Sequence, residues 1–196
     1  SEKIIDQLDQ TLKKFIKSKK IWCASSTHYP EEKFCGNVHK KLKTKYKNLM
    51  TIIIPRHIDR VDQIKEELNK QDLRVHLHFP KKNIPLNTDI YLVNAFGKTK
   101  SFYNSCNNVF LGGSIVNRGG QNPLEATRFG CNILHGPNIQ NFNEIYKLLK
   151  NLKLSNKIQN ENKMAILLEK LFKKNNKTNS KNKIKKLRLI GKKILN

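Results

Sequence analysis

Short apolar runs rich in β-branched residues alternate along the chain with stretches in which apolar residues recur every three or four positions. The runs predict six β-strands, at residues 21–26, 49–55, 74–79, 89–95, 108–114 and 132–137. The stretches between them predict helices at residues 31–46, 58–71, 100–106, 123–130 and 142–153. This alternation predicts an α/β fold, a Rossmann-like, doubly wound and mostly parallel sheet of about six strands with helices on both faces.

The two ends of the chain differ from this central pattern. An amphipathic N-terminal helix is predicted from the apolar residues Ile4, Ile5, Leu8, Leu12, Phe15 and Ile16. Residues 147–196 carry 16 Lys and Arg but only Glu161 and Glu169, and residues 173–186 are a low-complexity Asn/Lys run. The sequence therefore predicts an N-terminal helix or linker at 1–20, a Rossmann-like domain at 21–157 and a basic helical tail at 158–196.

Composition narrows the class of protein. The 196 residues include 39 Lys and Arg against 15 Asp and Glu, a formal net charge of +24, and 37% are hydrophobic. That hydrophobic content is enough for one ordinary α/β core and argues against a fully disordered chain. No apolar stretch is long enough to cross a bilayer, and residues 1–10 lack the apolar core of a signal peptide. We expect a soluble or peripheral protein whose chain, beginning at Ser1, is processed or cut from a longer one.

The cysteines and histidines of the sequence give little support for a metal site or a disulfide bond. Cys23, Cys35, Cys106 and Cys131 form no C-x-x-C pair, so we expect reduced thiols. His76 and His78 fall on one face of a predicted strand and in principle suit a metal, but a half-exposed strand is the favoured explanation. No D-x-D pair is present, and we expect neither a metal nor a cofactor.

Polar residues and glycines follow nearly every predicted strand, at the sheet edge where such folds bind ligands. They are Ser25–His28, Pro55–His57, Asn94–Gly97, and Gly112–Ser114 leading to Arg118–Glu125. Glycines let a phosphate approach the backbone, the start of helix 123–130 favours an anion, and Arg56 adds a charged donor. Glu125 is placed to accept hydrogen bonds from sugar hydroxyls. Each feature alone is commonplace, a tight turn, a surface cation or a helix-capping acid, but together they predict a nucleotide-sugar pocket.

Four segments resemble, in order and spacing, the 3-deoxy-D-manno-octulosonic acid (Kdo) transferases of lipopolysaccharide synthesis. These segments are Ser26-Thr27-His28 with Glu31-Glu32, Pro55-Arg56-His57 with Arg60, Gly112-Gly113-Ser114 with Arg118-Gly119-Gly120-Gln121-Asn122-Pro123-Leu124-Glu125, and Gly136-Pro137. The resemblance covers roughly residues 20–150. It implies the C-terminal, donor-binding half of a GT-B glycosyltransferase, an inverting and metal-independent enzyme that takes Kdo from CMP-Kdo.

The resemblance also assigns residues. Those matching the family's CMP contacts are Pro55, Arg56, Phe96, Gly97, Lys98, Asn122, Pro123, Leu124 and Glu125. Those expected to support the donor site are Ser26, Thr27, His28, Gly113, Ser114, Arg118, Gly119, Gly120 and Gln121. The family's proton acceptor is a carboxylate of the N-terminal domain, so an isolated C-terminal half would be inactive.

The implied partners are CMP-Kdo, a lipid A precursor, the N-terminal GT-B domain and an anionic membrane surface, at the cytoplasmic face of the bacterial inner membrane. The Lys-rich tail suits such a surface. Two alternatives stay open, a non-catalytic remnant of the transferase and a basic nucleic-acid-binding α/β module. The second has the required charge, but the sequence carries no RNP, KH or helix-turn-helix signature, which argues against nucleic acid as a partner.

Overall fold

The computed structural model describes residues 8–174 and residue 185. Its strands form one all-parallel sheet with the order β3-β4-β2-β1-β5-β6-β7. The strand bounds are β1 Lys20–Thr27, β2 Leu49–Pro55, β3 Val75–Leu77, β4 Ile90–Leu92, β5 Asn108–Leu111, β6 Asn132–His135 and β7 Ser155–Lys157. The predicted Rossmann-like α/β fold is confirmed, with β7 as a strand beyond the six expected.

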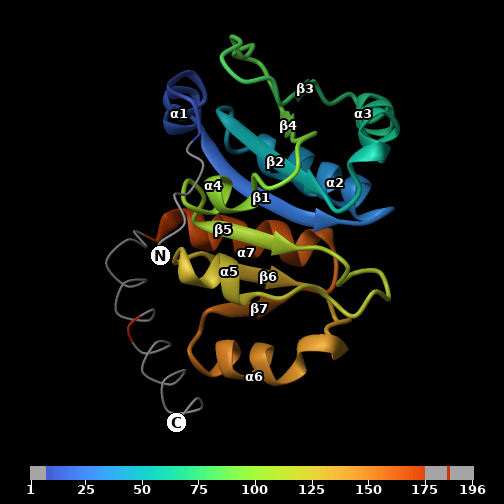
Figure 1. Cartoon of the computed structure of the whole chain (residues 1–196), viewed down its shortest axis with the longest axis vertical. Helices are drawn as coiled ribbons and strands as arrows, with labels where there is room; N and C mark the ends of the chain where they lie inside the picture. Colours follow the sequence, from blue (N-terminus) through green and yellow to red (C-terminus); the bar gives the residue numbers. More distant parts are fainter. Residues whose placement is uncertain (1–7, 175–184, 186–196) are drawn as a thin grey trace.

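Helices cover both faces of the sheet (Figure 1). They are α1 Gln10–Lys17, α2 Glu31–Lys43, α3 Val61–Asn69, α4 Thr99–Tyr103, α5 Leu124–Arg128, α6 Asn143–Asn151 and α7 Glu161–Lys173, with short 3-10 turns η1 Ile58–Arg60 and η2 Gln140–Phe142. Apolar side chains of α2, α3 and α7 share one core cluster, and those of α1, α4, α5 and α6 share the other. Each face of the sheet is thus sealed by its own helical layer.

The central strands β1 and β2 are the apolar centre of the domain. Every residue of β2 is buried, and Trp22 of β1 is inaccessible to solvent. From β1 the chain forms β2 beside it and β3 at the sheet edge, and then returns to place β4 between β3 and β2. It next crosses to the opposite side of β1 to form β5. Beyond the carboxyl ends of β1 and β5 lies the point where strand order reverses, which is the usual ligand site of open α/β sheets.

Helix α7 lies within the segment predicted to be a separate tail, yet it is part of the folded domain. Its Met164, Leu168 and Leu171 are buried in the same cluster as α2 and α3. The Asn160 side chain caps the helix by accepting a hydrogen bond from the Lys163 backbone N–H at 2.9 Å. The sequence predicts a solvated tail here because the lysines of α7 are more conspicuous than its apolar face. Residues 175–184 and 186–196 of the predicted tail lie outside the described residues.

The N-terminal helix is shorter than predicted but docks on the sheet. Leu12 and Ile16 of α1 are buried in the second cluster, and the Asp9 side chain caps its first turn. Ile4 and Ile5 lie outside the described residues. All four cysteines are buried and free. None of the helices in the described part of the chain is long and apolar enough to cross a membrane.

Candidate functional site

The carboxyl ends of β1, β2 and β5 bring the predicted segments to one edge of the sheet (Figure 1). Strand β1 ends in a bulge, because the pairing register with β2 shifts between Ser25 and Thr27. Ser26, inside the bulge, has the left-handed φ of 56° that a residue with a side chain rarely adopts. The bulge redirects the chain from the end of β1 into the loop that carries His28.

The loop after β5 is filled by a carboxylate from α2. Glu31 Oε2 accepts hydrogen bonds from the backbone N–H of His28 and Gly113, at 2.9 and 2.7 Å. Glu31 Oε1 accepts from the N–H of Ser114 and Ile115, at 3.0 and 2.9 Å. Burial raises the pKa of this carboxyl, while the four N–H bonds act in the opposite direction. The glycine loop was expected to let a phosphate approach its backbone, but these N–H groups already hold the chain's own anion.

A second buried carboxylate fixes the loop after β2. Glu32 accepts a hydrogen bond from the Thr27 hydroxyl at 2.9 Å and pairs through both oxygens with the Arg60 guanidinium, at 3.2 and 3.3 Å. The guanidinium of Arg60 also lies over the Tyr29 ring. Glu32, only 1% exposed, therefore ties the end of β1 to the turn that follows Arg56.

Four basic side chains lie at this edge: Arg56, His57 and Arg118 are exposed, and His28 is half-buried. His28 and His57 meet edge to face, with ring centroids 5.6 Å apart. Burial lowers the pKa of His28, and the nearby charges of His57, Arg118 and Arg56 lower it further, against a smaller opposing effect of Glu32. The Nε2 atom of His28 is buried and has no hydrogen-bond partner within residues 8–174. Arg56 and Arg118 are exposed, so the cluster is suited to an anion.

The segment from Arg118 to Gln121 folds back over the loop after β5. The Gly120 N–H donates to the Gly113 carbonyl at 2.9 Å. A Cβ on Gly113 would lie 3.3 to 3.4 Å from Arg118 Cβ, Gln121 Nε2 and His28 Cδ2. Gly113, Gly119 and Gly120 all have left-handed φ values, 66°, 80° and 77°, which explains why glycine stands at each. The three supporting side chains predicted around Gly113 are thus brought together.

The remaining predicted contacts lie on α5 and on the loops that precede α4 and α5. Phe96 is 75% exposed and Gly97 has a φ of 73°. The Asn122 side chain accepts from the Leu124 N–H at 3.0 Å, so one donor at the start of α5 is already used. The Glu125 carboxylate lies 3.4 Å from Lys100 Nζ. Within residues 8–174, no hydrogen bond or ion pair joins Arg56 to α5, so the two halves of the predicted CMP site are not bonded directly to each other.

Sequence reasoning missed the two carboxylates that organise this edge. Glu31 and Glu32 belong to the motif that begins at Ser26, and the sequence predicts no role for either of them. The signal was available, because two acids opening a helix directly after a strand lie close to the neighbouring loops at the same edge.

Within the described residues there is no group of three or more His, Cys, Asp and Glu side chains that suits a metal. His78, which was considered as a metal ligand, instead pairs with the Tyr91 hydroxyl at 2.7 Å.

Comparison with known proteins finds sequence relatives of this chain. No family model matches the chain. Over 171 residues, 87% of the chain, it is 30% identical to 3-deoxy-D-manno-octulosonic acid transferase of Rickettsia bellii, covering 41% of that protein. Over 149 residues, 76% of the chain, it is 29% identical to the enzyme of the same name from Haemophilus influenzae, covering 35% of it. The chain thus spans well under half the length of these curated relatives.

The fold agrees with solved structures of glycosyltransferase domains. The C-terminal CMP-Kdo binding domain of WaaA from Acinetobacter baumannii superposes with a TM-score of 0.74 at 24% identity, over 82% of this chain and 84% of that domain. The C-terminal domain of a group 1 glycosyl transferase (LpcC) from Francisella tularensis gives a TM-score of 0.53 at 11% identity, over 92% of this chain and 90% of the other. From the sequence relatives together with this fold, the chain belongs to the Kdo transferase family and has the architecture of the C-terminal domain of a GT-B glycosyltransferase.

Proposed function

We propose that this chain is the donor-binding half of a Kdo transferase and that CMP-Kdo binds at the carboxyl edge of β1, β2 and β5. The observation that carries the proposal is the cluster of His28, Arg56, His57 and Arg118 at the point where strand order reverses. Within residues 8–174 the Arg56 guanidinium has no hydrogen-bond or ion-pair partner. An exposed guanidinium without a partner suits a phosphate or a sugar carboxylate.

The two sides of the edge would hold different parts of the donor. Arg56 and the histidines would take the phosphate, and the exposed ring of Phe96 would pack against the cytosine. Glu125, held by Lys100, would accept hydrogen bonds from sugar hydroxyls. Because Glu31 occupies the N–H groups after β5, the nucleotide would meet side chains and the start of α5 rather than that loop.

These residues would act mainly on the leaving group. Breaking the bond from Kdo to phosphate builds negative charge on CMP, so a fixed guanidinium stabilises the transition state more than the ground state. A proton acceptor from the N-terminal domain would activate the hydroxyl of a lipid A precursor for inverting attack. The half described here would then bind donor without transferring it, at the cytoplasmic face of the bacterial inner membrane.

Titration with CMP tests the proposal. We expect Arg56→Ala to weaken CMP binding by roughly 10- to 100-fold, the range for a hydrogen bond to a charged group. Glu125→Ala should keep CMP binding but weaken CMP-Kdo, because the carboxylate is assigned to the sugar. Arg128→Ala, an exposed arginine at the end of α5, is the matched control. Equal CMP affinity in the wild type and Arg56→Ala would refute the assigned phosphate site.

A further inference from the structure

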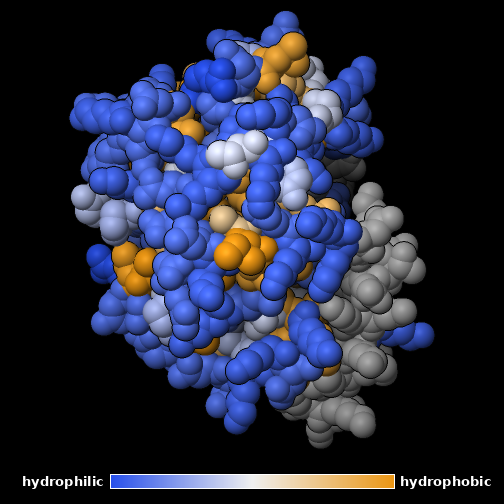
Figure 2. Space-filling view, turned by 180° about the vertical axis from the view of Figure 1, so that it is seen from behind, coloured by the Kyte–Doolittle hydropathy of each residue, from blue (hydrophilic) through white to orange (hydrophobic). Residues whose placement is uncertain are grey.

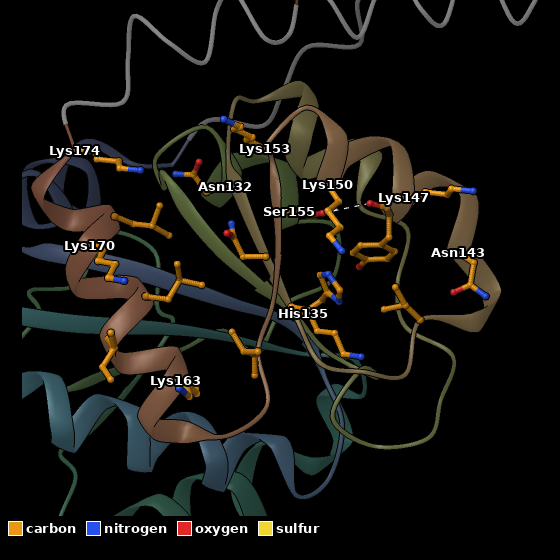
Figure 3. Close-up of a pocket in the computed structure, with 18 residues that line it drawn as sticks. Asn132, His135, Asn143, Lys147, Lys150, Lys153, Ser155, Lys163, Lys170 and Lys174 are labelled. Atoms are coloured by element: carbon orange, nitrogen blue, oxygen red, sulfur yellow. Dashed lines mark hydrogen bonds between the residues drawn. The ribbon is translucent and has the colours of Figure 1, made fainter.

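A broad groove crosses the β7 edge of the sheet, and its lining residues Ile139 and Tyr146 lie against the Gly120–Gln121 segment. It encloses about 1280 Å³ between α6, β7 and α7. Figure 3 shows Lys147 and Lys150 on α6 at one side, Lys163 and Lys170 on α7 at the other, and His135 between them. The two helices cover opposite faces of the sheet, so the groove wraps around its edge.

The lining is strongly and uniformly basic. It contains seven lysines and no acidic residue. All seven are exposed: Lys147, Lys150, Lys153, Lys157, Lys163, Lys170 and Lys174. The acids of α7 are directed elsewhere, because Glu161 accepts from the Asn37 side chain at 3.3 Å and Glu169 pairs with Lys45 at 2.7 Å, both on the α2 side. Positive charge is therefore gathered on one side of α7, and the occupant must be anionic.

Apolar and aromatic side chains decide which anion fits. Ile166 is 51% exposed, lies between Lys163 and Lys170 on α7, and lines the same groove. An apolar side chain among lysines is typical of a surface that rests in the headgroup layer of a bilayer. Proteins that bind single-stranded nucleic acid usually combine a basic groove with exposed aromatic rings on which the bases stack. The aromatic residue in the lining, Tyr146, is only 2% exposed and leaves no ring for that purpose.

We propose that this groove docks on an anionic phospholipid surface, with its lysines at the headgroup phosphates and Ile166 in the layer beneath. Figure 2, which views the molecule from behind, shows a mostly hydrophilic surface broken by small separate hydrophobic patches. The docking is therefore reversible and electrostatic, and it weakens as salt rises. It extends the proposed function by naming the surface that faces the membrane, and it is measured independently of CMP binding.

Vesicle binding by the full 196-residue chain tests the proposal. The probe is phosphatidylcholine vesicles with and without phosphatidylglycerol, and the variant is Lys147→Gln, Lys163→Gln and Lys170→Gln combined. Each lysine near an anionic surface contributes roughly fivefold to partitioning, so we expect a roughly 100-fold loss for the three. The matched control changes three exposed lysines outside the groove, Lys33, Lys41 and Lys47, to Gln.

Two further readouts separate the groove from other basic parts of the chain. Ile166→Trp should be quenched by brominated lipid, and Trp22 adds no response because it is fully buried. An equal loss in the groove variant and the control would overturn the proposal, since general charge would then explain binding. Absence of quenching at residue 166, or single-stranded RNA binding that is tighter than vesicle binding and lost in the groove variant, would overturn it as well. CMP binding should be unchanged in the groove variant, so a failure of the membrane-docking proposal can be told apart from a failure of the proposed donor site.

Discussion

Replacing Glu31 by Gln tests how the donor edge is held together. The side chain keeps its size, but one carboxylate oxygen becomes an NH₂ group. Each oxygen now accepts two backbone N–H bonds, from His28 and Gly113 on one and from Ser114 and Ile115 on the other. Whichever way the amide turns, two buried N–H donors face another donor.

The size of the effect follows from those two orphaned donors. A buried N–H left without a partner costs about 1–3 kcal/mol, so the pair costs about 2–6 kcal/mol. Burial also penalises the charge, which is why it raises the pKa of Glu31, and a neutral amide recovers part of that penalty. We therefore expect the free energy of unfolding to fall by about 2 kcal/mol, which for a domain of this size lowers Tm by roughly 4–8 °C.

Thermal unfolding followed by circular dichroism measures this shift, with Glu144→Gln on the exposed surface of α6 as control. Because the loop after β5 and the His28 backbone lose their common acceptor, CMP affinity should fall with stability. A Glu31→Gln protein that melts as high as Glu144→Gln would show that the carboxylate does not hold this loop.

Three other substitutions probe the rest of the domain. Burial alone would raise the pKa of Asp89, but the adjacent His39 ring, the hydrogen bonds from Arg74 and the Lys43 ammonium lower it well below its ordinary value of 3.8. The stabilisation from Asp89 is thus present above pH 3.8 and lost as pH falls below, so urea titrations should show Asp89→Asn less stable than wild type at neutral pH and the two converging in acid. Leu168→Ala should lower the free energy of unfolding by about 2–5 kcal/mol in the same titration, because this α7 side chain is fully buried; a loss no greater than that of an exposed substitution would place α7 outside the core. Gly112→Ala should abolish or severely lower the yield of folded protein, since its Cβ would overlap the Ser26 carbonyl and Thr27 Cα, and a normal Tm would contradict that geometry.

Periodicity carried most of the fold, and its failures have clear causes. The run at 49–55 is apolar except for Thr51 and forms β2 as predicted, while the 58–71 pattern forms η1 and α3. Strand β7 escaped because its three residues, Ser155, Asn156 and Lys157, have no apolar alternation, and it exists only because β6 offers a free edge. The prediction of a separate tail was wrong at α7, because the many Lys and Asn residues of this region hide the apolar positions that form its buried face.

The site was predicted less completely than the fold. Strand-end reasoning placed His28, Arg56 and Arg118 at one edge, and the structure brings them there. The two acids that open α2 indicate this edge of the sheet, but the contact of Glu31 with the loop after β5 joins segments 82 positions apart, and no local pattern specifies which loop the carboxylate reaches. That these residues bind CMP stays a prediction.

The lysines around β7 have a consequence for solubility. An outermost strand presents unpaired backbone groups on which the sheet of a second molecule can add, and such growth leads to aggregation. Two copies that met at this edge would bring the lysines around β7 of one copy next to those of the other, and these like charges would repel each other. We therefore expect the domain to resist edge-to-edge association at low salt and to lose that protection as salt rises, even where lipid is absent.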